Sequence, residues 1–167
     1  GKKISIDSAT MMNKVFEIIE AKKIFNISYK KLSILIHPKS YVHAILKFKD
    51  GLIKIIAHET TMEIPIRNTL NQVEKKNYKT KKINLKKLNN LNLSYINSNK
   101  FPLTKIIKKL PSRESLFETV LVTINDELVK LFLNKKISYL NLINKLSKLI
   151  NKKEFIKYKF IEPKKIT

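Results

Sequence analysis

Apolar and polar positions along the chain follow two different periods, which divide it into a strand-bearing part and a helical part. In residues 41–48 apolar and polar side chains alternate, and a second apolar run covers residues 52–57 after the turn sequence Lys49-Asp50-Gly51. Two such runs on either side of a glycine turn predict a β-hairpin. Short strands are also predicted at residues 4–6 and 33–36, and an extended segment at residues 88–96.

Helical spacing governs the other regions. Residues 11–25 carry apolar side chains three and four positions apart with no glycine or proline, and the preceding Asp7-Ser8-Ala9-Thr10 is typical of a helix start. We therefore expect a helix that begins within residues 7–10. Further helices are predicted at residues 103–110, 114–133 and 139–150. Residues 62–70 are ambiguous, with Pro65 suited to a first helical position.

These elements predict an α+β fold, in which a mixed sheet with helices is followed by a small C-terminal helical bundle. We expect an α+β domain over residues 1–98, a helical domain over residues 99–151 and a basic tail over residues 152–167. Within the first domain, residues 72–87 are rich in lysine and poor in apolar side chains, which is typical of a linker or loop.

The chain is strongly basic, with 35 Lys and Arg against 13 Asp and Glu and a net charge of +22. Its 43% hydrophobic content excludes a disordered polycation. Lysine, isoleucine and asparagine share A- and U-rich codons, so base composition explains much of this charge. Only Arg67 and Arg113 are arginines, which fits poorly with sequence-specific DNA reading. A nucleic-acid partner is therefore not expected, although the lysines would bind polyanions weakly and in a salt-dependent way.

Further class limits come from what the sequence lacks. The chain has no cysteine, which excludes disulfides and thiolate metal sites. No apolar run approaches the ~18–20 residues that span a bilayer, so no membrane partner is expected. No signal-peptide pattern is visible, so we expect a location inside a cell. The chain enters a predicted strand directly after Gly1, which suggests a piece of a longer protein.

The segment from Asp7 to Glu17 carries the most chemistry. If Ser8 or Thr10 caps the helix, free backbone N–H groups point out of its start and favour an anion. Asn13, Lys14 and Glu17 lie three and four positions apart, so all three can face the same space. This predicts a phosphate site with Glu17 as an oxygen ligand for Mg²⁺ or Mn²⁺. The alternative is an ordinary helix cap beside a surface Lys14–Glu17 ion pair.

Several longer segments carry a family resemblance. The run DSATMMNKVFEIIEA with the preceding GKKISI closely resembles the active-site segment of the 1-deoxy-D-xylulose 5-phosphate reductoisomerase family. ILIHPKSYVHAILKFKDG at residues 34–51 is similar to the family's HPxSxxH loop and hairpin, and MEIPI at residues 62–66 to its M-x-x-PI. FLNKKISYLNLI at residues 132–143 fits more loosely. Residues 1–98 would then be part of the family's catalytic domain.

The resemblance implies a role for each matching residue. Ser8, Asn13, Lys14 and Glu17 would bind a sugar-phosphate substrate, with Ser8 and Asn13 at its phosphate end. Lys14 and Glu17 would be catalytic, and Glu17 would also be the metal ligand. Gly1 matches a glycine that contacts NADPH. The HPxSxxH match makes His43 a candidate residue behind those that touch the substrate, although a structural role is the preferred interpretation of all three histidines.

The resemblance also implies an activity. Members of the family are NADP-dependent enzymes, both oxidoreductase and isomerase, that convert 1-deoxy-D-xylulose 5-phosphate to 2-C-methyl-D-erythritol 4-phosphate for isoprenoid synthesis. They use NADPH and Mg²⁺ or Mn²⁺, with Co²⁺ as an alternative. The expected partners are the sugar phosphate and a second copy in a homodimer, and the expected location is a bacterial cytoplasm or a plastid stroma.

Part of the family pattern is missing. Nothing resembles a GxGxxG turn, which two glycines could not supply. The family's other two carboxylate metal ligands lie upstream of the matching segment. We therefore expect a fragment that is inactive alone and needs an N-terminal nucleotide-binding domain in cis or in trans. The alternative is a non-catalytic basic binding protein on a degenerate scaffold; the four polar residues kept on one helix face favour the enzyme.

Overall fold

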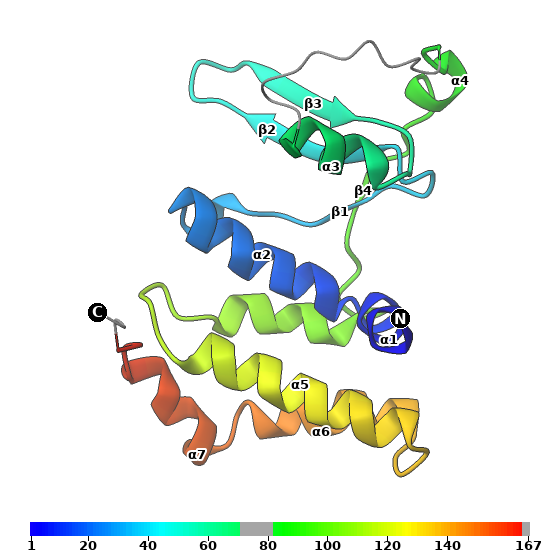
Figure 1. Cartoon of the computed structure of the whole chain (residues 1–167). Helices are drawn as coiled ribbons and strands as arrows, with labels where there is room; N and C mark the ends of the chain where they lie inside the picture. Colours follow the sequence, from blue (N-terminus) through cyan, green and yellow to red (C-terminus); the bar gives the residue numbers. More distant parts are fainter. Residues whose placement is uncertain (71–81, 165–167) are drawn as a thin grey trace. The chain divides into compact units, whose positions relative to one another are not determined.

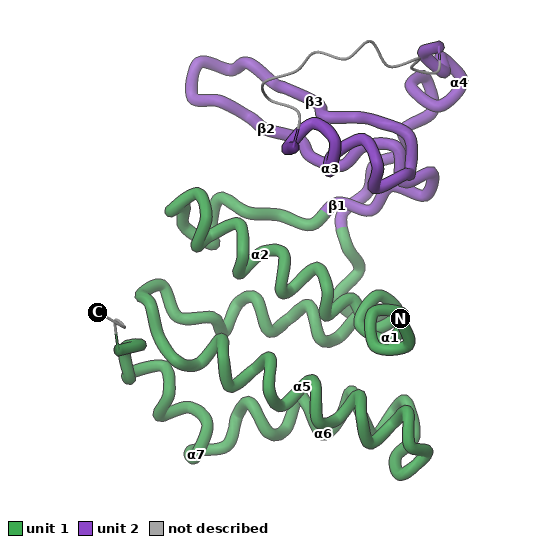
Figure 2. The backbone as a smooth tube through the Cα atoms, in the orientation of Figure 1, with its two compact units in different colours: residues 1–34, 96–167 green, residues 35–95 purple. Residues whose placement is uncertain are grey.

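The computed structural model describes residues 1–70 and 82–164, which form two compact units (Figure 2). The first unit comprises residues 1–34 and 96–167, and the second comprises residues 35–95. Helices build the first unit, and antiparallel strands with short helices build the second (Figure 1). The predicted α+β class is confirmed. The predicted boundaries at residues 98 and 151 concern domain organisation and stay a prediction.

The first unit opens with two helices, α1 (Lys2–Thr10) and α2 (Met12–Phe25), joined at Met11. The strand predicted at residues 4–6 is wrong, because these residues lie inside α1. Three alternating residues are too short a pattern to separate a strand from a helix. The predicted helix start at residues 7–10 is also wrong, because these residues form the last turn of α1. Met11 ends that helix in the left-handed conformation, with φ of 61°.

The rest of the first unit confirms the predicted helices with small shifts at their ends. A short 3₁₀ segment η1 (Tyr29–Lys31) follows α2, and the 3₁₀ helix η2 (Pro102–Lys109) opens the C-terminal part. The helices α5 (Phe117–Leu133) and α6 (Tyr139–Leu149) pack against each other. The expected basic tail contains α7 (Lys153–Ile156) and η3 (Lys157–Phe160), from which Phe155 and Tyr158 pack against the core.

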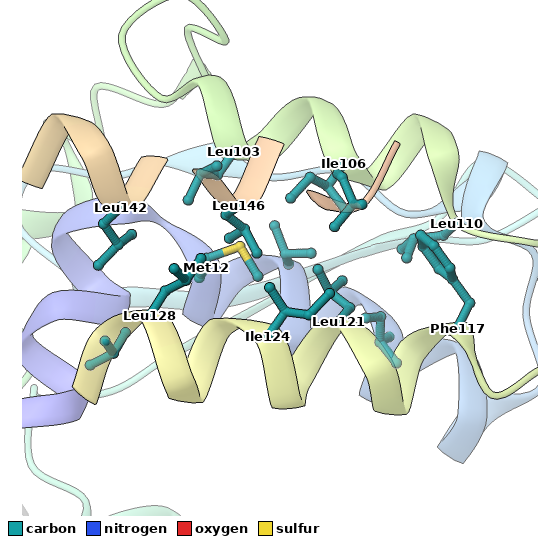
Figure 3. Packing of buried hydrophobic residues seen from close by; sticks show 14 residues of the cluster. Met12, Leu103, Ile106, Leu110, Phe117, Leu121, Ile124, Leu128, Leu142 and Leu146 are labelled. Carbon is teal, nitrogen blue, oxygen red and sulfur yellow. The ribbon is translucent and has the colours of Figure 1, made fainter. Parts of the chain in front are cut away.

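One hydrophobic core joins these helices. Apolar side chains from α2, η2, α5 and α6 point toward one another in it (Figure 3). Their spacing in sequence explains the packing, because residues three and four apart share one face of a helix. The fully buried members include Met12, Val15, Leu103, Leu121, Leu142 and Leu146.

The second unit contains the predicted hairpin. Strands β2 (Val42–Lys47) and β3 (Ile53–Ala57) pair antiparallel, with Ile45 opposite Ile55. Gly51 lies in the turn with φ of 91°, a conformation that glycine adopts without strain. Strands β1 (Leu35–Ile36) and β4 (Ser94–Tyr95) form a second antiparallel pair, each shorter than the segment predicted for it. In place of the expected mixed sheet, the described strands therefore form two separate pairs.

Two short helices complete the second unit. The ambiguous segment at residues 62–70 contains α3 (Glu63–Leu70), where Pro65 lies in the first turn and needs no hydrogen-bond partner for its nitrogen. Of the predicted linker at residues 72–87, residues 72–81 lie outside the described part, and Leu85–Leu88 form α4. Within residues 1–70 and 82–164, no helix is long and apolar enough to cross a membrane.

Candidate phosphate and metal site

The bend at Met11 creates a new helix start, and this start is where the structure places the polar residues. Asn13 and Lys14 occupy the first turn of α2, which contains no acidic residue, and Met11 makes no side-chain cap. The N–H groups of a first turn have no partner within the helix and carry partial positive charge. The helix start that carries Asn13 and Lys14 is therefore that of α2, and residues 7–10 end the preceding helix.

Lys14 and Glu17 are brought into direct contact. The Lys14 Nζ lies 2.8 Å from Glu17 Oε2 and 3.1 Å from Oε1. Both side chains are largely solvated, at 41% and 53% exposure, so this pair adds little to folding stability. Solvent access also leaves both groups open to a ligand. Next to them, Asn13 is half-buried, and its Oδ1 has no hydrogen-bond partner among the described residues.

Ser8 comes from the other side of the bend. It is exposed in the last turn of α1, and its carbonyl oxygen accepts the N–H of Met11 at 3.1 Å. The sequence interpretation placed Ser8 at the start of the same helix as Asn13, Lys14 and Glu17. The structure instead puts it on a separate helix whose last residue is Thr10.

Asp7 and Asn125 are polar residues of this region whose contact the sequence interpretation missed. Asp7 is 5% exposed, and its Oδ1 accepts the Nδ2–H of the fully buried Asn125 at 2.8 Å. The available signal was the position of Asn125 in the apolar stripe of α5, beside Ile124 and Leu128. A polar side chain in such a stripe needs a buried partner, but the sequence does not say which one.

The described residues do not form a metal site by themselves. Across residues 1–70 and 82–164, no group of three or more histidine, cysteine or acidic side chains is placed to hold a metal ion. Mg²⁺ and Mn²⁺ take six oxygen-rich ligands, whereas Glu17 is the one carboxylate of α2 that pairs with Lys14 beside Asn13. These residues could supply part of the coordination shell of a metal ion but not a complete one.

The two remaining predicted residues lie apart from this cluster in the chain. Gly1 is exposed before α1, and a side chain added there would meet nothing within 4 Å. His43 belongs to the second unit, where its ring stacks on that of His58 with centroids 3.6 Å apart. Its Nε2 also lies 3.3 Å from the His58 carbonyl oxygen. The roles expected for Gly1 and His43 stay predictions.

Comparison with known families and proteins places these features in context. The family model described as the DXP reductoisomerase C-terminal domain matches residues 58–165, and a second, the 1-deoxy-D-xylulose 5-phosphate reductoisomerase C-terminal domain, matches residues 1–25. The 1-deoxy-D-xylulose 5-phosphate reductoisomerase of Pelagibacter ubique is 57% identical over 166 residues, which cover 99% of this chain and 43% of that protein. The Persephonella marina enzyme of the same name is 41% identical over 83% of this chain and 37% of its own length.

Solved structures agree with these sequence matches. A 1-deoxy-D-xylulose 5-phosphate reductoisomerase from Zymomonas mobilis in complex with NADPH is 31% identical, with a TM-score of 0.77 over 89% of this chain and 39% of that one. A DOX-P reductoisomerase with fosmidomycin and magnesium is 30% identical, with a TM-score of 0.81 over 94% and 39%. The chain thus spans about two fifths of the length of the relatives that it matches.

Proposed function

Because the chain belongs to the family of DXP reductoisomerase C-terminal domains, we propose that it supplies the substrate-binding part of a 1-deoxy-D-xylulose 5-phosphate reductoisomerase. The whole enzyme would convert that sugar phosphate to 2-C-methyl-D-erythritol 4-phosphate, with NADPH as the reductant. The observation that carries this proposal is the acid-free first turn of α2, which presents Asn13 and Lys14 one turn before Glu17.

The phosphate of the substrate would bind at the bend between α1 and α2. The free N–H groups at the start of α2 donate toward an anion, and the Asn13 amide and Lys14 ammonium add side-chain donors. The exposed hydroxyl of Ser8 would add a further donor from the end of α1. A dianion bound there would also neutralise part of the local positive charge.

Glu17 would supply one ligand of a divalent cation, Mg²⁺ or Mn²⁺, with Co²⁺ as an alternative. When bound, such a cation acts as a Lewis acid on neighbouring carbonyl and hydroxyl oxygens of a substrate. In the structure the Lys14 ammonium pairs with the Glu17 carboxylate at 2.8 Å. On binding of the cation and the substrate, Lys14 would turn toward the substrate. Lys14 and Glu17 are the residues of this chain that we propose as catalytic.

The remaining parts of the enzyme would come from the three fifths of the relatives' length that this chain does not match. We propose that they include the nucleotide-binding domain, next to which Gly1 would contact NADPH, and the other metal ligands. His43 would lie behind the residues that touch the substrate. The chain alone should then be inactive. Since the relatives are bacterial, we propose the bacterial cytoplasm as its location.

The test is ligand-dependent protection of the chain against thermal unfolding. A phosphonate mimic of the substrate with Mn²⁺ should raise the melting temperature, because ligands that bind only the folded state stabilise it. Glu17→Ala should abolish the Mn²⁺-dependent part of the shift, and Asn13→Ala the phosphonate-dependent part. Glu20→Ala, an exposed acid on the same helix, is the matched control and should change neither. Equal protection by heparin, with no effect of Glu17→Ala, would instead favour a basic polyanion-binding protein.

We also propose a homodimer, formed through the hairpin of the second unit. Several large apolar side chains of this hairpin are exposed in the unit, namely Leu46, Phe48, Leu52, Ile53, Ile55 and Ile56. A two-stranded hairpin is marginally stable in water and needs a covering surface. Sedimentation of the wild-type chain should give a dimer, Ile55→Lys a monomer and the neighbouring Lys54→Gln a dimer. A wild-type monomer at every concentration would contradict this proposal.

A further inference from the structure

The last turn of α1, which carries Ser8, is held in place by side chains from the C-terminal helices. The Nδ2–H of Asn125 in α5 donates to Asp7 Oδ1 at 2.8 Å, across 118 positions of sequence. The hydroxyl of Tyr139 in α6 donates to the carbonyl oxygen of Ala9 at 3.0 Å. The residues before and after Ser8 are therefore both tied to helices that lie far away in the chain.

Lys3 completes the attachment from within α1. Its Nζ lies 3.4 Å from Asp7 Oδ2 and 2.9 Å from Asp126 Oδ1, so it bridges α1 and α5. The hydrogen bond to Asp126 is the main cause that raises the pKa of Lys3, with Asp7 contributing. The Asp7 carboxylate thus has one partner for each oxygen, and neither oxygen can rotate freely.

Stability alone does not explain a buried Asp7–Asn125 pair. Buried polar and charged pairs are often no better for stability than apolar side chains of similar volume, whereas they fix one geometry. Asn125 is fully buried in the stripe that also contains Ile124 and Leu128, where leucine would suit the core. The one hydrogen bond described for its side chain goes to Asp7, the residue next to Ser8.

We propose that Asn125 is a positioning residue for the phosphate site. Through Asp7 it fixes the last turn of α1, and with it the Ser8 hydroxyl and the Met11 bend from which α2 starts. Because Asn13 and Lys14 follow that bend directly, an error in its direction displaces the phosphate donors on both helices together. This inference rests on the proposed function for the nature of the ligand, a phosphate group.

The experiment titrates the 167-residue chain with inorganic phosphate and follows the backbone amide resonances of residues 8–14. Asn125→Ala should weaken phosphate binding about tenfold or more, because displacements on the order of 1 Å cost large factors at such sites. Leu110→Ala, beside Phe117 at one end of the cluster in Figure 3, is a control that removes a buried apolar side chain and lowers stability. It should leave the phosphate affinity of the folded protein unchanged, as should the exposed Asn144→Ala.

A reciprocal exchange covers the case in which Asn125→Ala does not fold. Asn125→Asp places a carboxylate against that of Asp7 and should weaken phosphate binding. The double variant Asp7→Asn with Asn125→Asp rebuilds the pair with donor and acceptor exchanged, and should recover affinity to within about threefold of wild type. Failure of this recovery in a folded double variant, or wild-type affinity in Asn125→Ala, would overturn the inference.

Amide hydrogen exchange separates this inference from the proposed function. If the wild-type amides do not respond to phosphate, the proposed function fails at its phosphate site. The positioning role is then tested by the amide exchange rates of residues 8–11. Asn125→Ala should raise these rates at least tenfold. Leu110→Ala should leave the exchange rates of these residues unchanged relative to those of the other slowly exchanging amides. Unchanged exchange in Asn125→Ala would overturn the positioning role by itself.

Discussion

The buried carboxylate of Glu118 is satisfied by hydrogen bonds from neighbouring hydroxyl groups, one of them that of Tyr29. Glu118 is 3% exposed, and its oxygens accept hydrogen bonds from the Ser115 hydroxyl at 2.8 Å and the Tyr29 hydroxyl at 3.3 Å. The Tyr29 bond ties η1 to the first turn of α5. Burial, together with the charge of Glu118, raises the pKa of Tyr29. A phenol with a raised pKa stabilises the fold only while it stays protonated.

This pKa predicts a loss of stability at high pH. Below pH 10 both states keep the Tyr29 proton; above pH 10 the unfolded chain loses it first, so the free energy of unfolding should fall as pH rises. Tyr29→Phe should cost about 1 to 2 kcal/mol at pH 7, through the lost hydrogen bond to a charged group. The difference in the free energy of unfolding between wild type and Tyr29→Phe, measured by urea titration, should then become smaller above pH 10.

Lys3 also has a raised pKa. Because wild type and Tyr29→Phe both contain Lys3, its effect cancels from the difference between their free energies of unfolding. A gap between wild type and Tyr29→Phe that stays constant from pH 7 to pH 11 would contradict the assigned pKa of Tyr29.

At the scale of elements, the bend at Met11 sets where the residues of the candidate site lie. A residue other than glycine in the left-handed conformation costs about 1 to 2 kcal/mol, so α1 and α2 are separated against the preference of Met11 itself. The packing that offsets this cost is visible on both sides, because Thr10 and Met12 are buried and the Thr10 hydroxyl donates to the Ile6 carbonyl oxygen at 2.9 Å. Tertiary contacts therefore create the helix start at which Asn13 and Lys14 lie.

The bend gives a paired prediction with glycine and alanine. Met11→Gly should be about 1 kcal/mol more stable than Met11→Ala, because only glycine adopts a φ of 61° without steric cost. Within α1, the exposed Ser5 should show the reverse order, with Ser5→Ala about 1 kcal/mol more stable than Ser5→Gly. Equal stability of the two Met11 variants in chemical denaturation would contradict the left-handed conformation.

For the whole molecule, repulsion due to the net charge of +22 is stronger than the attraction within the ion pairs that the described residues form. Most of these pairs are largely solvent-exposed and contribute little each. Surplus lysines repel one another in the compact state and attract any polyanion. Burial lowers the pKa of Lys159, and repulsion from the nearby Lys109 lowers it further.

Screening of this repulsion predicts that salt stabilises the chain. The melting temperature should rise between 10 and 200 mM NaCl, as the Debye length falls from about 30 Å toward about 8 Å. The rise should level off above about 0.5 M, where screening is nearly complete, and this plateau is the internal control. A melting temperature that is flat at low salt would contradict net repulsion in the folded state.

The sequence by itself determined the elements whose pattern is local and long enough. The apolar pattern at residues 41–57, with the turn at Gly51, predicted the hairpin. The apolar stripe from Phe117 to Leu131 predicted α5. Both patterns repeat over several residues, which makes them reliable. The family resemblance was also visible in short segments of sequence, and family models match residues 1–25 and 58–165. The sequence also singled out Asn13 and Lys14, whose role at a phosphate stays a prediction.

Only the tertiary structure decided how the first segment folds. Residues 4–6 are helical and Met11 forms a bend because α1 packs against α2 and α5. A local sequence pattern holds no information about these contacts. The partner of Asp7 lies 118 positions away at Asn125, and a side chain in an apolar stripe does not indicate which distant group it will meet. Local sequence sets the preference of each segment, but burial and hydrogen bonding between distant residues select among the conformations that these preferences allow.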